Sequence, residues 1–329
     1  MIRSHWLKGS AVFAACLSLL TCGASAHAGL VITPTFGSSI TSDPNAAAIE
    51  GVINSAIAVY QSKFTDPITV TIQFNEMNSG LGQSVTGFYN VPYQSYLNAL
   101  TADAKSANDA TALAHLPAGP NNPVTGDASI NVKSANARAV GLPGSFPGFV
   151  DGTFDGAIGL NTHITDVGSP GTTGQFSLLA TVEHEIDEVL GLGSALPSVP
   201  LGTIFPEDLY RYDSSGFRSF TTSSNAQAFF SIDGMTRLAQ FDNQNDGGDF
   251  GDWQSNPLPN GVQPQVQDAF ASQGAHPTLG DNEITALDVI GYDLAQAVVT
   301  PEPASLTLVA TGTLLLAGYR LRRRARPVA

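Results

Sequence analysis

The sequence predicts an α+β fold for residues 29–299, with a separate apolar segment at each end of the chain. Two observations predict this class. Apolar residues recur at helical spacing in some stretches, whereas β-branched residues alternate with polar ones in others. No internal repeat is visible, and the region is long enough to bury a sizeable core. Only 13% of the residues are charged, and Gly, Ser, Thr and Asn are frequent, which is typical of a loop-rich extracellular domain.

The N-terminal residues 1–28 are typical of a secretory signal peptide. Basic residues precede an apolar stretch from Ala11 to Leu20, and small residues follow it. We expect signal peptidase to cleave after Ala26 or Ala28. The alternative is an apolar N-terminal helix in the core, but the stretch is short and lacks helical periodicity.

The composition of the remaining chain excludes several classes of function. Cys16 and Cys22 both lie in the signal segment, so the mature chain has no disulfide, no thiol catalysis and no cysteine-rich zinc site. Residues 29–299 contain seven basic and 27 acidic residues, a net charge of 7 − 27 = −20. This excess argues against nucleic acid as a partner and is compatible with bound divalent cations.

Five stretches predict the order of elements within the domain. A helix is expected from Pro44 to Tyr60, because apolar residues recur on one face and Asp43 precedes Pro44 as an N-cap would. Ile68–Phe74 alternates with period two and is rich in β-branched residues, so it is predicted as a strand. The other expected elements are a helix over Tyr93–Ala104, a loop over Pro117–Gly126 and a strand over Gly156–Asn161.

The stretch Thr181–Gly191 carries the most specific chemical signal. It reads T-V-E-H-E-I-D-E-V-L-G and matches the zinc-protease pattern H-E-x-x-H, except that Glu188 replaces the second histidine. In that pattern two ligands approach the metal from one helix face, and the glutamate between them takes a proton from the attacking water. Because carboxylate oxygen binds Zn²⁺ at about the same distance as imidazole nitrogen, roughly 2.0–2.2 Å, His184 and Glu188 are candidate ligands. Glu185 is the candidate general base.

The spacing of this stretch predicts an amphipathic helix. At about 100° per residue, His184, Asp187 and Glu188 fall on one acidic stripe with small neighbours. The alternative is a solvated acidic face on which the histidine occurs by chance. The residues expected to face the core are Leu179, Val182, Ile186, Val189 and Leu190.

The sequence leaves the third metal ligand open. In the longer pattern H-E-x-x-H-x-x-G-x-x-H, Gly191 keeps the glycine, but Ser194 stands at the last histidine and is a poor zinc ligand. Asp208 in F-P-E-D-L-Y-R-Y is the preferred candidate, and His276 is another. An acidic residue just after a proline is also typical of a helix start, which gives Asp208 a purely structural interpretation as well.

An aspartate-rich loop suggests a different metal site. Asp242, Asp246, Asp249 and Asp252 are spaced through a Gly- and Asn-rich stretch and could supply oxygen ligands to Ca²⁺. The spacing departs from the EF-hand pattern, and a solvated turn accounts for it equally well.

Five motifs occur in order along the chain. They are H-E-I-D-E-V-L-G, D-L-Y-R-Y-D, F-F-S-I-D-G at Phe229–Gly234, G-D-F-G-D-W at Gly248–Trp253 and I-T-A-L-D-V-I-G-Y-D at Ile284–Asp293. Together these motifs resemble a family of secreted bacterial zincin metalloproteases. The resemblance covers most of residues 45–293 and implies a zincin-like α+β domain with a mixed sheet and an active-site helix. It also implies Zn²⁺ as cofactor and a protein or peptide as substrate.

The C-terminal residues 300–329 form a separate segment. Pro301–Glu302–Pro303 precedes an apolar stretch from Ala304 to Tyr319, and an arginine cluster follows. This pattern resembles the PEP-CTERM sorting signal of Gram-negative bacteria. The resemblance implies export, transient retention in the inner membrane through an apolar helix, and cleavage by an exosortase-type enzyme. The domain would then be extracellular or on the cell surface. An ordinary single-pass membrane anchor is the alternative.

The sequence therefore predicts a secreted or surface-exposed zinc-dependent metalloendopeptidase. The competing hypothesis is a catalytically silent extracellular surface or matrix protein, which uses the same scaffold for binding. Stoichiometric zinc would distinguish the two, because a silent scaffold need not hold a metal ion.

Overall fold

A computed structural model describes residues 29–167, 174–197, 203–243, 246–295, 311–313 and 320. The predicted signal peptide and nearly all of the predicted sorting tail lie outside these residues. Among the described residues, no helix has both the length and the apolar character needed to cross a bilayer.

The main sheet has four strands and is mixed, as expected from the sequence. Its order is β1-β2-β6-β3; the first three strands are parallel, and β3 runs antiparallel to β6 at one edge. Strands β2 and β6 confirm the two predicted strands with small shifts at their ends. The bounds are β1 Val31–Phe36, β2 Thr69–Glu76, β3 Gly82–Thr86 and β6 Gly156–Leu160.

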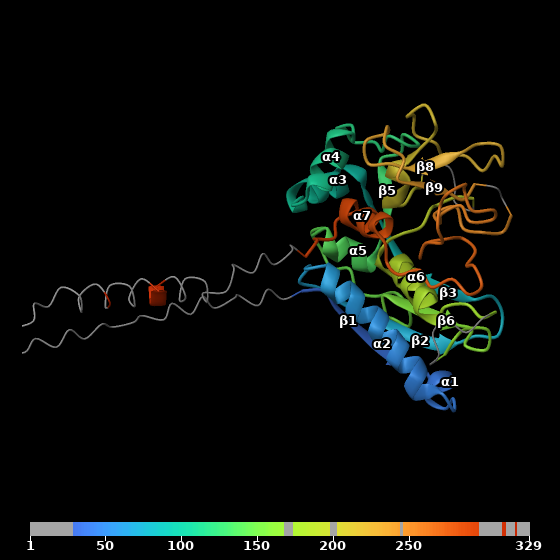
Figure 1. The fold of residues 1–329 in the computed structure, drawn as a ribbon. Helices are drawn as coiled ribbons and strands as arrows, with labels where there is room; N and C mark the ends of the chain where they lie inside the picture. The colour runs from blue at the N-terminus through green and yellow to red at the C-terminus, as the bar shows by residue number, and fades with distance from the viewer. Residues whose placement is uncertain are drawn as a thin grey trace, which may run out of the picture.

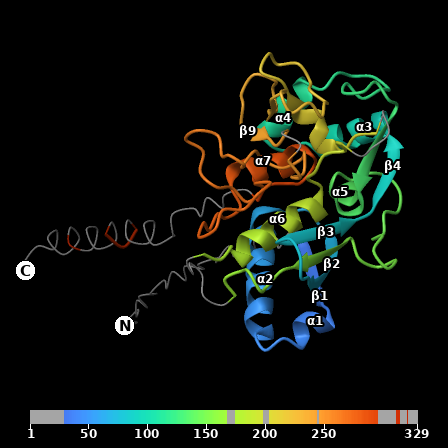
Figure 2. The ribbon, with the colours of Figure 1, turned by 90° about the vertical axis from the view of Figure 1, so that its right-hand side faces the viewer.

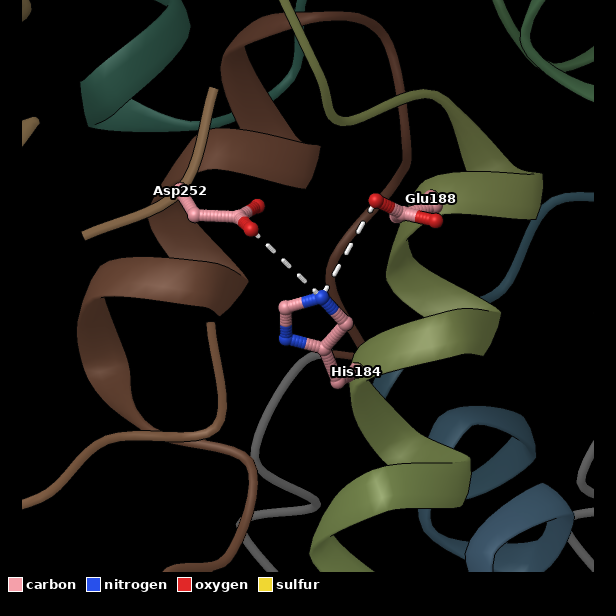
Figure 3. A group of neighbouring side chains, drawn as sticks. All are labelled: His184, Glu188 and Asp252. Atoms are coloured by element: carbon pink, nitrogen blue, oxygen red, sulfur yellow. Dashed lines mark ion pairs between the residues drawn. The ribbon is translucent and has the colours of Figure 1, made fainter. Parts of the chain in front are cut away.

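Two long helices cover one face of this sheet. Helix α2 (Ala46–Lys63) packs on β1, α6 (Leu178–Leu190) packs on β6 and β3, and the two helices contact each other (Figures 1 and 2). Gly156 lets β6 approach α6 closely, because a Cβ there would overlap the side chain of Val189. Helix α6 is the predicted motif helix, and it carries the side chains of His184 and Glu188 (Figure 3).

The predicted start of α2 is wrong by two residues. Asn45 occupies the N-cap position and Ala46 begins the helix, whereas Asp43 and Pro44 precede it. The Asp43 carboxylate accepts a hydrogen bond from the Asn45 backbone N–H at 2.6 Å, so it closes a turn before the helix instead of capping the helix itself.

The rest of the domain lies on the other side of α6 from α2 and the main sheet (Figure 2). It contains the predicted helix α3, which ends at Asp103, and the predicted loop over residues 117–126. Its helices are α3 Tyr93–Asp103, α4 Ala107–Ala114, α5 Ser134–Ala139, the 3₁₀ helix η1 Pro206–Tyr210 and α7 Asp281–Val289. Strands β4 Phe88–Pro92 and β5 Ser129–Lys133 form an antiparallel pair. Strands β7 Arg211–Tyr212, β8 Ala228–Phe230 and β9 Ala239–Phe241 form a three-stranded antiparallel sheet. The short helix α1 Ser38–Thr41 follows β1.

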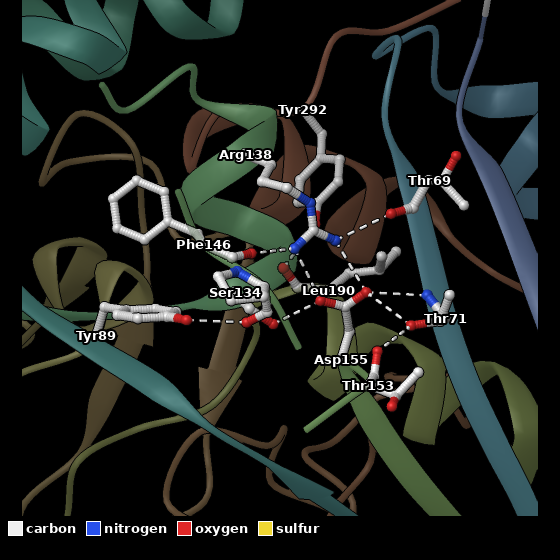
Figure 4. Close-up of polar contacts among 11 residues, drawn as sticks. Thr69, Thr71, Tyr89, Ser134, Arg138, Phe146, Thr153, Asp155, Leu190 and Tyr292 are labelled. Carbon is white, nitrogen blue, oxygen red and sulfur yellow. Dashed lines mark hydrogen bonds and ion pairs between the residues drawn. The ribbon is translucent and has the colours of Figure 1, made fainter. Parts of the chain in front are cut away.

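A buried ion pair links the main sheet to this second region. Asp155 precedes β6 and is 3% exposed. The Arg138 guanidinium donates two hydrogen bonds to its carboxylate, from Nη1 to Oδ1 and from Nη2 to Oδ2, each at 2.9 Å (Figure 4). The same carboxylate accepts hydrogen bonds from Ser134 Oγ at 2.6 Å and from the Thr71 backbone N–H at 2.9 Å. The network therefore joins α5, β2 and the start of β6 beneath α6.

Asp155→Ala is expected to lower the free energy of unfolding by about 3 kcal/mol, because it leaves Arg138 partly buried without its partner. Chemical denaturation of the purified domain measures this loss. Asp151→Asn is the matched control, since Asp151 is exposed in the same loop and Asn also tolerates its positive φ of 49°. Equal stability of Asp155→Ala and the control would contradict the role assigned to the ion pair.

Candidate metal centre

Helix α6 presents His184 and Glu188 on one side because they are four residues apart, and both ends of the helix are fixed. Ser177 Oγ accepts a hydrogen bond from the Ala180 backbone N–H at 3.2 Å, which caps the first turn. Gly191 ends the helix with a φ of 155°, a conformation that favours glycine. His184 and Glu188 are one helical turn apart, and both side chains remain partly accessible.

Asp187 does not share this face, which corrects the sequence-based prediction. Its side chain is fully buried, and its Oδ1 accepts a hydrogen bond from the Tyr60 hydroxyl of α2 at 2.8 Å. The same hydroxyl is 2.7 Å from the Glu183 carbonyl oxygen. Asp187 therefore helps to join α6 to α2. The prediction from helical spacing is wrong at this residue because α2 covers the side of α6 that carries Asp187.

Asp252 completes a group of three potential ligands with His184 and Glu188 (Figure 3). His184 Nε2 lies 3.7 Å from Asp252 Oδ2 and 3.9 Å from Glu188 Oε1. One potential ligand atom from each residue lies within 4.8 Å of the others. These three residues form the one metal-capable group of His, Cys, Asp and Glu side chains found among the described residues.

The group of His184, Glu188 and Asp252 is called the triad below. In each of its side chains, the atom that faces away from the other two residues makes a hydrogen bond that holds the side chain in place. His184 Nδ1 is 2.9 Å from the Val266 carbonyl oxygen, which fixes Nδ1 as the protonated nitrogen and leaves the Nε2 lone pair for a ligand. Gln267 Nε2 donates to Asp252 Oδ1 at 2.7 Å. Ser84 Oγ of strand β3 donates to Glu188 Oε2 at 2.5 Å. The remaining atoms, Nε2, Oδ2 and Oε1, thus point to one place.

The electrostatic environment of the triad favours a cation. Burial lowers the pKa of the His184 imidazole, but Asp252, Glu185 and Glu188 oppose this and raise it to about 10. Burial raises the pKa of Asp252, although His184 opposes the shift. A metal ion that binds here must therefore displace a proton from His184, as is usual for histidine ligands.

Glu185 lies beside the triad, buried between α6 and strand β3. Its side chain is 4% exposed, and Oε2 has no hydrogen-bond partner among the described residues. Burial raises the pKa of Glu185 to about 9, against the opposing effect of His184. Gly82 makes room for this carboxylate, because a Cβ there would overlap Glu185 Oε1.

The triad and Glu185 line a single cavity of about 670 Å³. Residues 79–84, at and before strand β3, form one wall, α6 forms the floor, and residues 264–272 contribute to the opposite wall. Because β3 is at the edge of the sheet, its outer side borders the cavity instead of another strand of this sheet. The cavity is therefore large enough for a peptide segment, and all four residues are part of its lining.

Asp208, the preferred third ligand from the sequence, is not part of this group. Its carboxylate accepts hydrogen bonds from Ser194 Oγ at 2.5 Å, from the Ala195 N–H at 3.0 Å and from the Phe205 N–H at 2.9 Å. It thus caps the start of η1, which is the structural interpretation of its place after Pro206. Ser194, at the position of the last histidine in the longer pattern, contacts Asp208 and not the triad.

Asp208→Asn is expected to leave the zinc stoichiometry unchanged and to lower the free energy of unfolding by about 1 kcal/mol through its weakened cap. Zinc content after dialysis and a denaturation curve measure the two effects separately. Loss of zinc from a protein that remains folded would restore Asp208 as a ligand candidate.

The other sequence candidates also lie elsewhere. His276 Nδ1 is 3.3 Å from Asp166 Oδ2, and this pair is not part of the triad. Of the four aspartates proposed for Ca²⁺, only Asp252 belongs to a metal-capable group among the described residues. Asp242 is buried, whereas Asp246 and Asp249 are exposed. The loop therefore contributes one residue, Asp252, to the triad.

Sequence reasoning named Asp252 only as a possible Ca²⁺ ligand and did not place it beside His184 and Glu188. It also missed Gln267 and Ser84, which hold two side chains of the triad. The G-D-F-G-D-W motif contains Asp252, but no local spacing distinguishes it from its acidic neighbours. Comparison with known proteins adds no further assignment, since no protein-family model, no curated protein and no solved structure matches the chain. The function proposed for this chain therefore rests on the chemistry of the residues that line the cavity.

Proposed function

We propose that the chain is an exported zinc-dependent metallopeptidase with a zincin-like domain. The observation that supports this most is the arrangement of His184, Glu188 and Asp252 around one point, with Glu185 beside them in the same cavity. Three ligands that leave one position free are typical of catalytic zinc sites, whereas structural sites use four protein ligands.

The donor set fits a divalent cation. One imidazole and two carboxylates supply one nitrogen and two oxygens, all of which are zinc ligands in proteins. The second atom of each side chain is already hydrogen-bonded, so the triad is arranged before a metal binds. A zinc ion held there would polarise the scissile carbonyl and make the attacking water more acidic.

Glu185 acts as the general base in this proposal. Its carboxylate lines the cavity next to the ligands and has an oxygen without a hydrogen-bond partner among the described residues. It would take a proton from the attacking water on one oxygen and deliver it to the leaving amine. Burial raises the pKa of this carboxyl group in the metal-free site, and a bound zinc ion would lower it by favouring the ionised form that accepts the proton.

Strand β3 offers a site for the peptide backbone. An edge strand presents unpaired N–H and C=O groups, and an extended peptide can add to it as a further strand. Residues 79–84 line the cavity, so a peptide bound along β3 would carry its backbone past the triad. The position of Ser84 in this strand, bonded to Glu188, ties the strand to the ligands.

Metal content and hydrolysis test this proposal together. Purified residues 29–299 are expected to bind about one zinc per chain and to hydrolyse an unstructured protein such as casein. Removal of the metal with a chelator should abolish hydrolysis, and addition of zinc should restore it. A folded protein that takes up no zinc on titration would instead support the silent binding protein.

Export and C-terminal processing complete the proposal, on the strength of the signal-peptide pattern and the PEP-CTERM resemblance. The apolar stretch from Ala304 to Tyr319 would hold the exported chain in the inner membrane, while the arginines after it stay on the cytoplasmic side. An exosortase-type enzyme would then cut near Pro301–Glu302–Pro303. Intact-mass analysis of protein from the native host is expected to show a C-terminus near residues 300–304. Mature protein ending at Ala329 would indicate a permanent anchor.

A further inference from the structure

The cavity at the triad is acidic far beyond what the proposed reaction requires. Among the residues that line it, none is lysine or arginine. The acidic lining residues are Glu185, Glu188, Asp249, Asp252 and Asp268. A divalent cation would be balanced by the two carboxylates of the triad, and Glu185 has its own role in the proposed function. Two carboxylates, Asp249 and Asp268, therefore remain without an assigned task.

Asp268 is buried with one unsatisfied oxygen. It is 5% exposed; Oδ2 accepts a hydrogen bond from the Gln265 N–H at 2.9 Å, whereas Oδ1 has no partner among the described residues. Leaving a buried carboxylate oxygen unpaired costs free energy, and a donor from a bound molecule would recover it. Asp268 lines the cavity while its Oδ1 is covered, so a change of its side-chain rotamer would bring this oxygen to a donor on a bound molecule.

Asp249 contributes a second carboxylate from the loop that carries Asp252. It is exposed and lines the same cavity. Apart from His184 of the triad, the basic side chain that acts on the Asp249 carboxylate is Lys133, which is buried and donates hydrogen bonds to the Glu188 and Leu192 carbonyl oxygens at 2.6 and 2.7 Å. Lys133 does not line the cavity, so it leaves both aspartates available to a ligand.

We propose that Asp249 and Asp268 select substrates with a lysine or arginine side chain close to the scissile bond. This inference rests on the proposed peptidase function of the same cavity. An ammonium or guanidinium group supplies several hydrogen-bond donors and a positive charge, which match the unpaired buried oxygen of Asp268 and the second carboxylate, Asp249, of the same cavity. The net charge of −20 over residues 29–299 would also attract cationic chains to the cavity.

Matched peptides test the preference. A set of internally quenched peptides would carry Lys, Ala or Glu at each position around a cleaved bond, with the remaining sequence unchanged. At one of these positions the zinc-loaded enzyme is expected to show a kcat/KM at least about tenfold higher for Lys than for Glu. Equal kcat/KM values at every position would overturn the inference while leaving the peptidase function intact.

Two variants locate the preference in the structure. Asp268→Asn and Asp249→Asn are each expected to reduce the Lys-to-Glu ratio severalfold without loss of zinc. Asp246→Asn is the matched control, because Asp246 is exposed in the same loop but does not line the cavity. Asp249→Asn changes an exposed side chain and should fold normally, so the test does not depend on Asp268 alone. An unchanged ratio in both variants would remove these residues from recognition.

A binding experiment separates this inference from the proposed function. Fluorescently labelled Lys-rich and Glu-rich peptides of equal length would be titrated with the zinc-treated Glu185→Gln protein at two salt concentrations. Tighter binding of the Lys-rich peptide that weakens in Asp249→Asn and Asp268→Asn backgrounds supports cation recognition, even if no peptide is ever hydrolysed. Equal binding of the two peptides contradicts it, whether or not the wild-type protein is an active peptidase.

Discussion

Asp252→Ala is expected to weaken zinc binding about a hundredfold to a thousandfold. The free energy of zinc binding in protein sites is roughly 10–16 kcal/mol. Divided equally among four ligands, it is several kcal/mol for each ligand, which corresponds to this loss of affinity. Asp252 contributes one of three side-chain ligands, and its Oδ2 lies 3.7 Å from His184 Nε2. Titration against a chromophoric chelator measures the change. His184→Ala is expected to abolish zinc binding, because it removes the only nitrogen ligand of the triad.

A graded set of controls makes this prediction specific. Ser84→Ala removes the hydroxyl that bonds Glu188 Oε2 and is expected to weaken zinc binding about tenfold, as for other residues that orient ligands. Asp208→Asn should bind zinc like the wild-type protein. Titration with Mn²⁺ and Ca²⁺ tests the metal preference, since two carboxylates also suit harder cations. Wild-type zinc affinity in a folded Asp252→Ala protein would contradict the assignment of the third ligand.

The sequence predicts the regular elements well where one face of the element is buried. Strand β2 and helix α3 follow directly from alternation and helical spacing, because their apolar residues form the core. The start of α2 is less accurate, since Asp43 and Asn45 can both cap a helix and only the local turn decides between them.

The candidate site is predictable only in its helical part. His184 and Glu188 are related by a fixed spacing of one turn, so their common face follows from helix geometry alone. Asp252 reaches them from a loop that lies far along the chain, and its position depends on tertiary contacts such as the Gln267 hydrogen bond. Asp187 has the spacing of a surface residue, yet α2 covers it and Tyr60 bonds it. The periodicity of the α6 sequence does not show that another helix, α2, packs over Asp187.

Glu185→Gln is expected to lower kcat about a hundredfold to ten-thousandfold while zinc affinity stays close to that of the wild-type protein. A positioned general base contributes roughly this factor to a proton-transfer step, and an amide cannot accept the proton. Glu185 does not belong to the triad, so its loss leaves all three ligands in place. Hydrolysis of a quenched peptide and zinc titration on the same preparation measure both quantities.

Two further variants separate the chemistry of Glu185 from its effect on structure. Glu185→Asp keeps the carboxylate but shortens the side chain, so its kcat should fall between those of Glu185→Gln and the wild-type enzyme. Gly82→Ala leaves Glu185 unchanged in sequence, but the new Cβ would overlap Oε1 and force the carboxylate away from β3. It should therefore lower kcat and retain zinc, because the three atoms nearest that Cβ belong to Glu185 and Thr181 and not to the triad. Full activity in Glu185→Gln would remove Glu185 from the mechanism, and full activity in Gly82→Ala alone would show that the carboxylate can act from a different position.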